Sequence, residues 1–243
     1  MPLDLMVVMP VYNEEECIVD VVRSWRDQLS EMSLDFALLV LNDGSTDGTP
    51  QALQVFHNDA RVRIVNKPNA GHGPTILQGY KIAVEEAEWV FQCDSDNEMH
   101  PEHFRKFWDR RERYDALFGV RVGREQNAAR QILSGGSRVV VKLLFGRGVR
   151  DVNVPYRLMR SQVLEPIVAA IPVDTFAPNV LISGALARAK KRLWNAPVPH
   201  QNRATGAPSI LRWKLWKAAF RSLRQTLFFQ IGNRGQGTRD KAK

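Results

Sequence analysis

The chain has 243 residues, of which 44% are hydrophobic and 25% are charged, with a formal net charge of +8. This composition supports a folded core of one large domain, with or without an appendage, and excludes a chain that is disordered throughout. No signal peptide or bilayer-spanning run is visible, and Cys17 and Cys93 form no metal-ligand pattern, so we expect a reduced, cytosolic setting.

The first 93 residues alternate short apolar runs with segments of helical periodicity. The apolar runs predict buried strands at Leu5–Met9, Phe36–Leu41, Val62–Val65 and Trp89–Cys93, with a further short strand at Ala116–Val120. The periodic segments predict helices at Glu15–Leu29, Thr49–Phe56 and Thr75–Glu86. Strands that alternate with helices imply right-handed βαβ units, so we expect an α/β fold with a mostly parallel sheet.

Polar clusters follow three of these strands, at residues 10–16, 42–47 and 94–98. Ligands of open parallel sheets bind beyond the carboxyl ends of the strands, so the three clusters should meet at one edge.

The cluster Asp94-Ser95-Asp96-Asn97-Glu98 places three carboxylates directly after a buried strand. Like charges this close resist ionising together, so a cation is expected among them. Mg²⁺ and Mn²⁺ prefer oxygen ligands and are often shared between carboxylates and a substrate's phosphates. An isolated Asp-x-Asp tripeptide is more often a solvated acidic turn, and only its position beside the other clusters favours a metal.

The other two clusters are ambiguous on physical grounds alone. Asn42–Gly48 suits a pair of turns with a helix cap, although Asp43 could also accept hydrogen bonds from a base or ribose. Met9–Glu14 suits a strand-to-helix turn whose acidic residues favour the helix N-terminus. It also suits a nucleotide site in which the aromatic Tyr12 packs on a base.

Four motifs taken together resolve the ambiguity. VVMPVYNEEE, LNDGSTDGT, NKPNAGHGPTILQGY and the DSD turn, in this order and spacing, resemble family 2 glycosyltransferases of the GT-A fold. The resemblance covers residues 5–160 well and extends more loosely to about 209. Within the family, the chain is most similar to the polyprenyl-phosphate sugar transferases. A GT-A (Rossmann-like) open sheet flanked by helices is therefore the expected fold.

The resemblance implies a role for each matching residue on the donor side. It assigns the nucleotide sugar to Pro10, Tyr12, Glu14, Asp43, Asp94 and Ser95. It assigns a divalent metal, Mg²⁺ or Mn²⁺, to Asp94, Asp96 and Glu98, where Glu98 stands in place of the glutamine of the polyprenyl branch. Such a metal would neutralise the leaving nucleoside diphosphate.

The resemblance also implies an acceptor side and a mobile loop. It assigns the acceptor phosphate to Arg121, Arg130 and Ser134, and the donor diphosphate to Arg203 on a loop that closes. Asp151 stands where glycan-transferring relatives keep a general base, whereas a phosphate acceptor needs none because its oxygen is already ionised. The segment after Asp151 reads Val-Asn-Val-Pro-Tyr-Arg, in which Val-Pro replaces the family's Ser-Gly, and this departure concerns the acceptor more than the donor.

The positive charge is concentrated near the C-terminus, where residues 192–243 hold eleven Lys and Arg against Asp240 alone. Projected on a helix, Lys214, Lys217, Arg221 and Arg224 share an arc of about 80°, and apolar side chains fill much of the remainder. This pattern is typical of a helix at an anionic membrane surface, although the same apolar face would also suit packing on the domain. We expect a catalytic domain at 1–208, a basic amphipathic helix at 209–231 and a polar tail at 232–243.

The sequence thus predicts an inverting glycosyltransferase, peripheral on the cytosolic face of the membrane. It would use a nucleoside-diphosphate sugar and a lipid acceptor, most simply polyprenyl phosphate, and would not bind nucleic acid. Transfer to a glycan or lipid hydroxyl, with Asp151 as base, is the main alternative. A basic nucleic-acid-binding module explains the C-terminal charge but not the acidic loops, which repel phosphate backbones. A donor-binding protein without catalysis would not need the metal and arginine positions.

Overall fold

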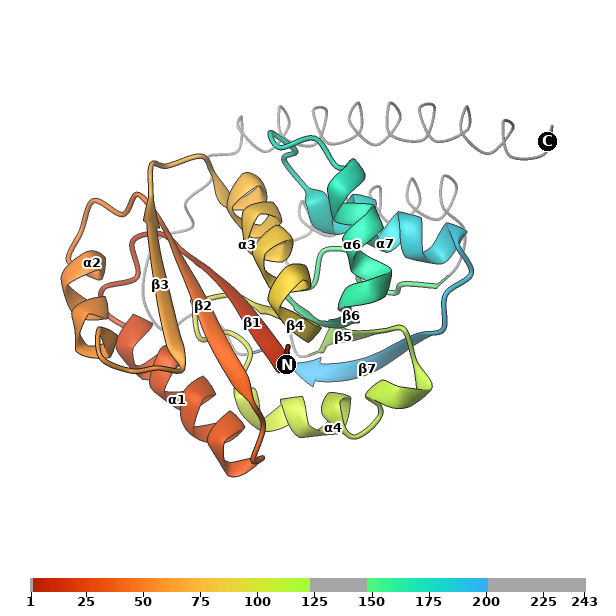
Figure 1. Cartoon of the computed structure of the whole chain (residues 1–243), viewed down its shortest axis with the longest axis horizontal. Coiled ribbons are helices and arrows are strands. Elements are labelled where there is room, and N and C mark those ends of the chain that lie inside the picture. The colour runs from red at the N-terminus through yellow and green to blue at the C-terminus, as the bar shows by residue number, and fades with distance from the viewer. Residues whose placement is uncertain (1, 123–147, 201–243) are drawn as a thin grey trace.

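The computed structural model describes residues 2–122 and 148–200, which form one seven-stranded sheet with helices on both faces (Figure 1). The strands are β1 (Leu3–Val11), β2 (Phe36–Asp43), β3 (Val62–Lys67), β4 (Ala87–Cys93), β5 (Ala116–Val122), β6 (Tyr156–Arg160) and β7 (Leu193–Pro199). The helices are α1 (Ile18–Glu31), α2 (Thr49–Ala52), α3 (His72–Glu86), α4 (Phe104–Trp108), α6 (Ser161–Ala170) and α7 (Pro178–Arg188). Short 3₁₀ turns η1 (Leu53–Phe56), η2 (Pro101–His103) and η3 (Arg111–Arg113) complete the described elements.

The strands follow the order β3-β2-β1-β4-β6-β5-β7 across the sheet. β1 pairs in parallel with β2 and β4, β2 with β3, and β5 with β7, whereas β6 runs antiparallel to both of its neighbours. β1, β2 and β4 are nearly continuous apolar runs because helices cover both faces of the sheet there.

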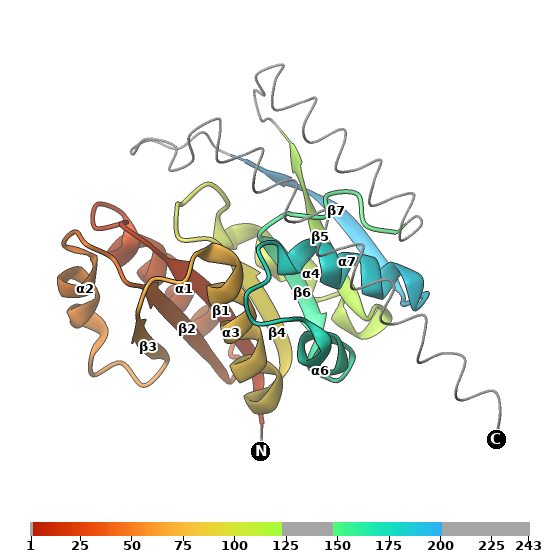
Figure 2. The ribbon, with the colours of Figure 1, turned by 90° about the horizontal axis from the view of Figure 1, so that it is seen from above.

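The helices form a layer on each face of the sheet. α3 and α6 pack beside one another on one face, with α7 next to them, while α1 and α4 lie on the other (Figures 1 and 2). The layer of α1 and α4 closes over an aromatic cluster in which Trp25 lies 5.1 Å from Phe91, and Phe91 lies 4.9 Å from Phe104 and 4.8 Å from Tyr156, between ring centroids. This packing fixes the end of β4, which carries the three carboxylates, against the start of β6.

The predicted mostly parallel α/β sheet is confirmed, and each of the five predicted strands and three predicted helices lies within or overlaps an observed element. The predicted Thr49–Phe56 helix is divided between α2 and η1, and the predicted Thr75–Glu86 helix begins earlier, at His72. The sequence did not predict β6 and β7, which extend the sheet beyond β4. The predicted amphipathic helix at 209–231 and the tail at 232–243 lie outside the described residues, and the domain boundary at 208 stays a prediction.

No helix within residues 2–122 and 148–200 combines the length and the apolar character that a membrane span requires.

Candidate functional site

The three polar clusters meet at one edge of the sheet, as their positions after parallel strands predicted. The first and second loops are joined by a hydrogen bond from the backbone N–H of Asn13 to Ser45 Oγ at 3.0 Å. The first and third loops touch where Cys17 Sγ lies 3.5 Å from the backbone oxygen of Ser95. The carboxyl ends of β1, β2 and β4 therefore form a single site.

The antiparallel strand β6 brings a fourth segment to this edge. Because Tyr156 at its start pairs with Cys93 at the end of β4, the residues that precede β6 lie beside the carboxylate turn. Asp151 is one of these residues. β5 and β7 end at the same edge. Arg121 lies near the end of β5, and His200 directly follows β7, where its backbone N–H donates to the Val122 carbonyl at 3.0 Å.

The turn after β4 concentrates negative charge in a partly buried place. Burial, followed by the nearby carboxylate of Asp96, raises the pKa of Asp94 well above its usual value, and Arg121 acts in the opposite direction. Asp96 Oδ1 accepts the backbone N–H of Glu98 at 3.1 Å, which closes the turn, and Asn97 takes the left-handed conformation with φ 57°. A cation at this place would allow the carboxylates to ionise together.

The chemistry of these side chains fits a divalent metal shared with a substrate. The donors are carboxylate oxygens, which Mg²⁺ and Mn²⁺ prefer, and one or two carboxylates suffice when phosphates supply further ligands. No three His, Cys, Asp or Glu side chains within 2–122 and 148–200 form a ready-made metal site. The predicted metal roles of Asp94 and Asp96 stay predictions.

Glu98 has a partner that the sequence did not indicate. Its Oε2 lies 2.6 Å from Nε2 of His200, 102 residues further along the chain. The Nδ1 of His200 is buried without a hydrogen-bond partner among the described groups. The predicted metal role of Glu98 stays a prediction, and its carboxylate is engaged with His200 in this structure. Only the end of β7 brings the two together, so no local pattern could have revealed His200.

Asp43 is buried and its carboxylate is bound by its own chain. The ammonium of Lys67 contacts Oδ1, the N–H of Ala70 donates to Oδ1 at 2.9 Å, and the N–H of Gly71 donates to Oδ2 at 2.9 Å. Burial alone raises the pKa of Asp43, but the bonds from Lys67 and Ala70 outweigh it and hold that pKa below its usual value. Asp43 thus holds the loop before α3, and contact with a base or ribose stays a prediction.

The other residues predicted to grip the nucleotide lie around the end of β1. Pro10 is buried in β1 and pairs with Leu41, whereas Tyr12 is 43% exposed and open to contact. Glu14 is half-buried; its backbone N–H donates to Thr49 Oγ1 at 2.8 Å, and its Oε2 lies 3.5 Å from Cys17 Sγ. The turn after β1 is thus held to α2 through Thr49, and the Tyr12 side chain is partly exposed in the same turn.

Arg121 and Asp151 meet as a bidentate ion pair at the same edge. Arg121 donates from Nε to Oδ2 at 2.8 Å and from Nη2 to Oδ1 at 3.0 Å. Burial alone raises the pKa of Asp151, but the bond from Arg121 outweighs it, and the pKa lies below its usual value. Asp151 is thus an ionised and weakly basic carboxylate. The sequence named both residues but did not predict that they pair.

The structure does not describe three of the predicted site residues. Arg130, Ser134 and Arg203 lie outside the described residues, and their predicted roles with the acceptor phosphate and the donor diphosphate stay predictions.

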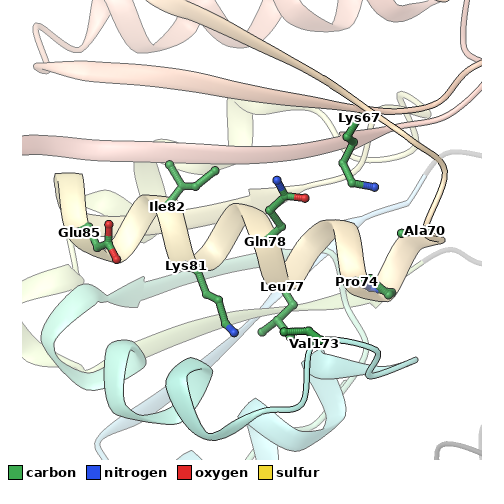
Figure 3. A pocket seen from close by; sticks show the side chains of 9 residues that line it. All are labelled: Lys67, Ala70, Pro74, Leu77, Gln78, Lys81, Ile82, Glu85 and Val173. Atoms are coloured by element: carbon green, nitrogen blue, oxygen red, sulfur yellow. The ribbon is translucent and has the colours of Figure 1, made fainter.

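A separate hollow of about 400 Å³ runs along the outer side of α3 (Figure 3). Lys67 and Ala70 line one end and Ile82 and Glu85 the other, with Val173 from the loop after α6 beside Leu77. None of the carboxylates of the β4 turn lines it, but its Lys67 and Ala70 end adjoins Asp43, which both of these residues bind.

The sequence matches the family model described as glycosyl transferase family 2 over residues 6–167. A similar relative is the undecaprenyl-phosphate 4-deoxy-4-formamido-L-arabinose transferase of Pseudomonas aeruginosa (strain LESB58), 26% identical over 224 residues, which cover 90% of this chain and 64% of that protein. The chain therefore spans less than two thirds of the length of this relative.

Solved structures share the fold at low sequence identity. Glucosyl-3-phosphoglycerate synthase from Mycobacterium tuberculosis, in complex with Mn²⁺, uridine diphosphate and phosphoglyceric acid, is 18% identical with a TM-score of 0.67, covering 94% of this chain and 78% of that one. Mannosyl-3-phosphoglycerate synthase from Rubrobacter xylanophilus is 12% identical with a TM-score of 0.66, covering 96% and 75%. At these identities the likeness is one of fold.

Proposed function

The chain belongs to glycosyl transferase family 2, and from that premise we propose that it transfers a sugar, with inversion, from a nucleoside-diphosphate sugar to polyprenyl phosphate at a membrane surface. Support on the donor side comes from the edge where β1, β2 and β4 end, with Tyr12 exposed and the carboxylates of Asp94 and Asp96 together. The solved relative crystallised with Mn²⁺ and uridine diphosphate supports a divalent metal and a nucleotide donor.

The observation that carries the choice of acceptor is the Arg121–Asp151 pair. A hydroxyl acceptor must lose a proton as it attacks, and a carboxylate whose pKa is held low by a guanidinium is a poor base for that task. A phosphate monoester brings an oxygen that is already ionised. Arg121 offers the planar donor set that binds phosphate well, and Asp151 would orient it. The undecaprenyl-phosphate named for the Pseudomonas relative agrees with this choice.

The proposed roles fall on two sides of the edge, one for the sugar donor and one for the acceptor. A metal held by Asp94 and Asp96 would neutralise charge that develops on the departing diphosphate. Tyr12 and the loop held by Asp43 would orient the nucleotide. Arg121 would hold the acceptor phosphate on the opposite side, so that its oxygen attacks the anomeric carbon in line with the leaving group and inverts it.

The test is a transfer assay with purified full chain, Mn²⁺ or Mg²⁺, and a panel of radiolabelled sugar nucleotides, with and without polyprenyl phosphate in detergent. We expect label in the lipid phase only when polyprenyl phosphate is present. The matched variant Asp96→Ala should stay folded and lose this transfer. Donor hydrolysis without lipid product, or transfer to a hydroxyl acceptor instead, would overturn the proposed acceptor, and full activity of Asp96→Ala would overturn the metal assignment.

A further inference from the structure

β4 contains one polar side chain in its buried centre, Gln92. A buried amide is costly unless each of its polar atoms finds a partner. Asn179 Nδ2 donates to Gln92 Oε1 at 2.8 Å. Tyr80 Oη lies 2.7 Å from the same oxygen and 2.9 Å from Asn179 Oδ1, and its single proton can be donated to one of the two at a time. Gln92 Nε2 donates to Asp94 Oδ1 at 3.3 Å. The amide therefore links α3, α7 and the first carboxylate of the turn.

The bond from Asn179 and the bond to Asp94 decide which way the amide faces. Asn179 donates to Oε1, which also lies within reach of the Tyr80 hydroxyl, so the NH₂ group is left on the opposite side, toward Asp94. Reversing the amide alone would set its NH₂ against the NH₂ of Asn179 and its oxygen against the carboxylate. Gln92, Tyr80 and Asn179 are buried, and hydrogen bonds are stronger in such surroundings than at the surface.

Asn179 is itself held in place from the acceptor side of the site. The buried Arg157 donates from Nη1 to the Asn179 carbonyl at 3.2 Å, and from Nη2 to the Val152 carbonyl at 3.0 Å. Ser183 of α7 donates to the same Val152 carbonyl at 3.2 Å. Val152 directly follows Asp151, so one buried network runs from the acceptor-side loop to the carboxylate turn.

We propose that Gln92 is a positioning residue that fixes the carboxylate of Asp94 for metal binding, with Tyr80 and Asn179 holding its amide in the required direction. This inference rests on the proposed function, because it gives Asp94 a metal to hold. The physical reason is repulsion: Asp96 and Glu98 both act on Asp94, and a neutral donor behind it keeps one oxygen turned inward without adding a competing positive charge. Groups behind a metal ligand orient it and tune its affinity.

The decisive variant is Gln92→Met, which keeps the length of the side chain and removes both polar atoms. Mn²⁺ binding to the purified full chain, followed by electron paramagnetic resonance of free Mn²⁺, gives the affinity without turnover. We expect the Kd for Mn²⁺ to rise about tenfold or more, as for other groups behind metal ligands. Tyr80→Phe removes the hydroxyl that lies between Gln92 Oε1 and Asn179 Oδ1, leaves the bond from Asn179 Nδ2 in place, and should raise the Kd about threefold.

Tyr114→Phe is the matched control, because Tyr114 stacks on Trp194 with 6.2 Å between ring centroids and takes no part in the network. It should leave the Kd for Mn²⁺ unchanged. Thermal unfolding checks that every variant is folded. If Gln92→Met does not fold, Tyr80→Phe decides in its place, and an unchanged Kd in the folded variant overturns the proposal.

Crystal structures of the metal-free wild type and Gln92→Met separate this inference from the proposed function. We expect Asp94 to leave its wild-type orientation in the variant. An unmoved Asp94 in Gln92→Met would overturn the positioning role, as an unchanged Kd for Mn²⁺ would. A wild type that binds no Mn²⁺ and transfers no sugar, with Asp94 displaced in the variant, would instead overturn the proposed function and leave the positioning role standing.

Discussion

At the scale of single residues, the site is decided by which carboxylates have a cationic partner. Asp151 pairs with Arg121 and Asp43 with Lys67, whereas Asp94, within residues 2–122 and 148–200, is approached by the imidazole of His72, with Nε2 at 4.0 Å from Oδ1. The pKa values of Asp43 and Asp151 are therefore lowered, and that of Asp94 is raised. Of these three carboxylates, that of Asp94 is therefore the one whose ionised form a bound cation would favour most.

Asp151→Asn tests whether this residue acts as a base. With polyprenyl phosphate as acceptor, we expect kcat to fall by less than about tenfold, whereas removal of a general base usually costs about 10²–10⁴-fold. The acceptor oxygen is already ionised, and the asparagine oxygen can still accept one bond from Arg121. Steady-state transfer kinetics measure the change, and a loss of the larger size would indicate a hydroxyl acceptor with Asp151 as base.

Lys67→Met should make the free energy of unfolding depend on pH in a new way. Both side chains of the Lys67–Asp43 pair are buried, at 11% and 5% exposed, and breaking such a pair costs about 3–5 kcal/mol at neutral pH. The folded-state pKa of Asp43 is lowered, so the pair stabilises the protein above the unfolded pKa of about 4 and this contribution is lost as the pH falls through the folded value.

In the variant, burial of Asp43 is opposed by the N–H groups of Ala70 and Gly71 without the ammonium, so its pKa should rise above the wild-type value. The difference in free energy of unfolding between wild type and Lys67→Met should therefore shrink as the pH falls from 7 through the pKa of Asp43 in the variant. Urea unfolding at several pH values measures it. Lys81→Met, a lysine of the same hollow outside the Asp43 cluster, is the control and should show no such trend. A pH-independent difference would contradict the argument.

At the scale of elements, the position of α3 depends on the absence of a side chain at Gly79. A Cβ there would lie 2.4 Å from Val8 Cγ1 and 2.9 Å from Leu41 Cδ1, and both residues are fully buried in the sheet. The helix therefore sits close enough to the sheet for its N-terminal end to meet the edge site.

Longer segments such as α1 could be predicted because five buried side chains recur at helical spacing.

Gly79→Ala should destabilise the protein by about 1–3 kcal/mol. Alanine gains about 1 kcal/mol in helix propensity over glycine, but overpacking against a buried strand costs more when the neighbours cannot move. Val8→Ala opens the space that the new methyl group needs. The double variant should thus be less destabilised than the sum of the two single variants, which denaturant unfolding of all four proteins measures. If the effects of the two single variants simply add, the contact between residue 79 and Val8 does not cause the loss of stability in Gly79→Ala.

At the scale of the whole molecule, the basic C-terminal segment is expected to bring the catalytic edge to an anionic membrane. Changing four basic residues to glutamine should weaken binding to vesicles that contain anionic lipid, by about 1 kcal/mol for each charge near the surface. Vesicle sedimentation at low and at high salt measures the effect, which salt should screen. The residues to change are Lys214, Lys217, Arg221 and Arg224.

A control variant removes the same charge elsewhere. Its four residues are exposed and lie on the catalytic domain: Arg105, Arg188, Lys190 and Lys191. It should bind anionic vesicles as the wild type does. Equal weakening in both variants would show that net charge, and not the C-terminal segment, governs the membrane interaction, and no weakening in either would contradict a membrane role.

The sequence by itself determined the α/β class, the parallel strands β1–β4 and the edge at which their polar loops meet. These features follow from local periodicity and from the geometry of parallel strands, and both can be read over short stretches. The family motifs are likewise local, so Tyr12, Asp43, Asp94, Asp96, Arg121 and Asp151 were identified from sequence. Their individual roles stay predictions.

Only the tertiary structure decided which of these residues meet. Arg121 pairs with Asp151 across 30 residues, Gln92 with Asn179 across 87, and Glu98 with His200 across 102. The segment before β6, the helix α7 and the edge strand β7 bring these partners together. The short, mixed sequences of β6 and β7 carry too little periodicity to be predicted. Contacts between distant segments depend on strand order and helix packing, which are set by burial across the whole core and by no single stretch of the chain.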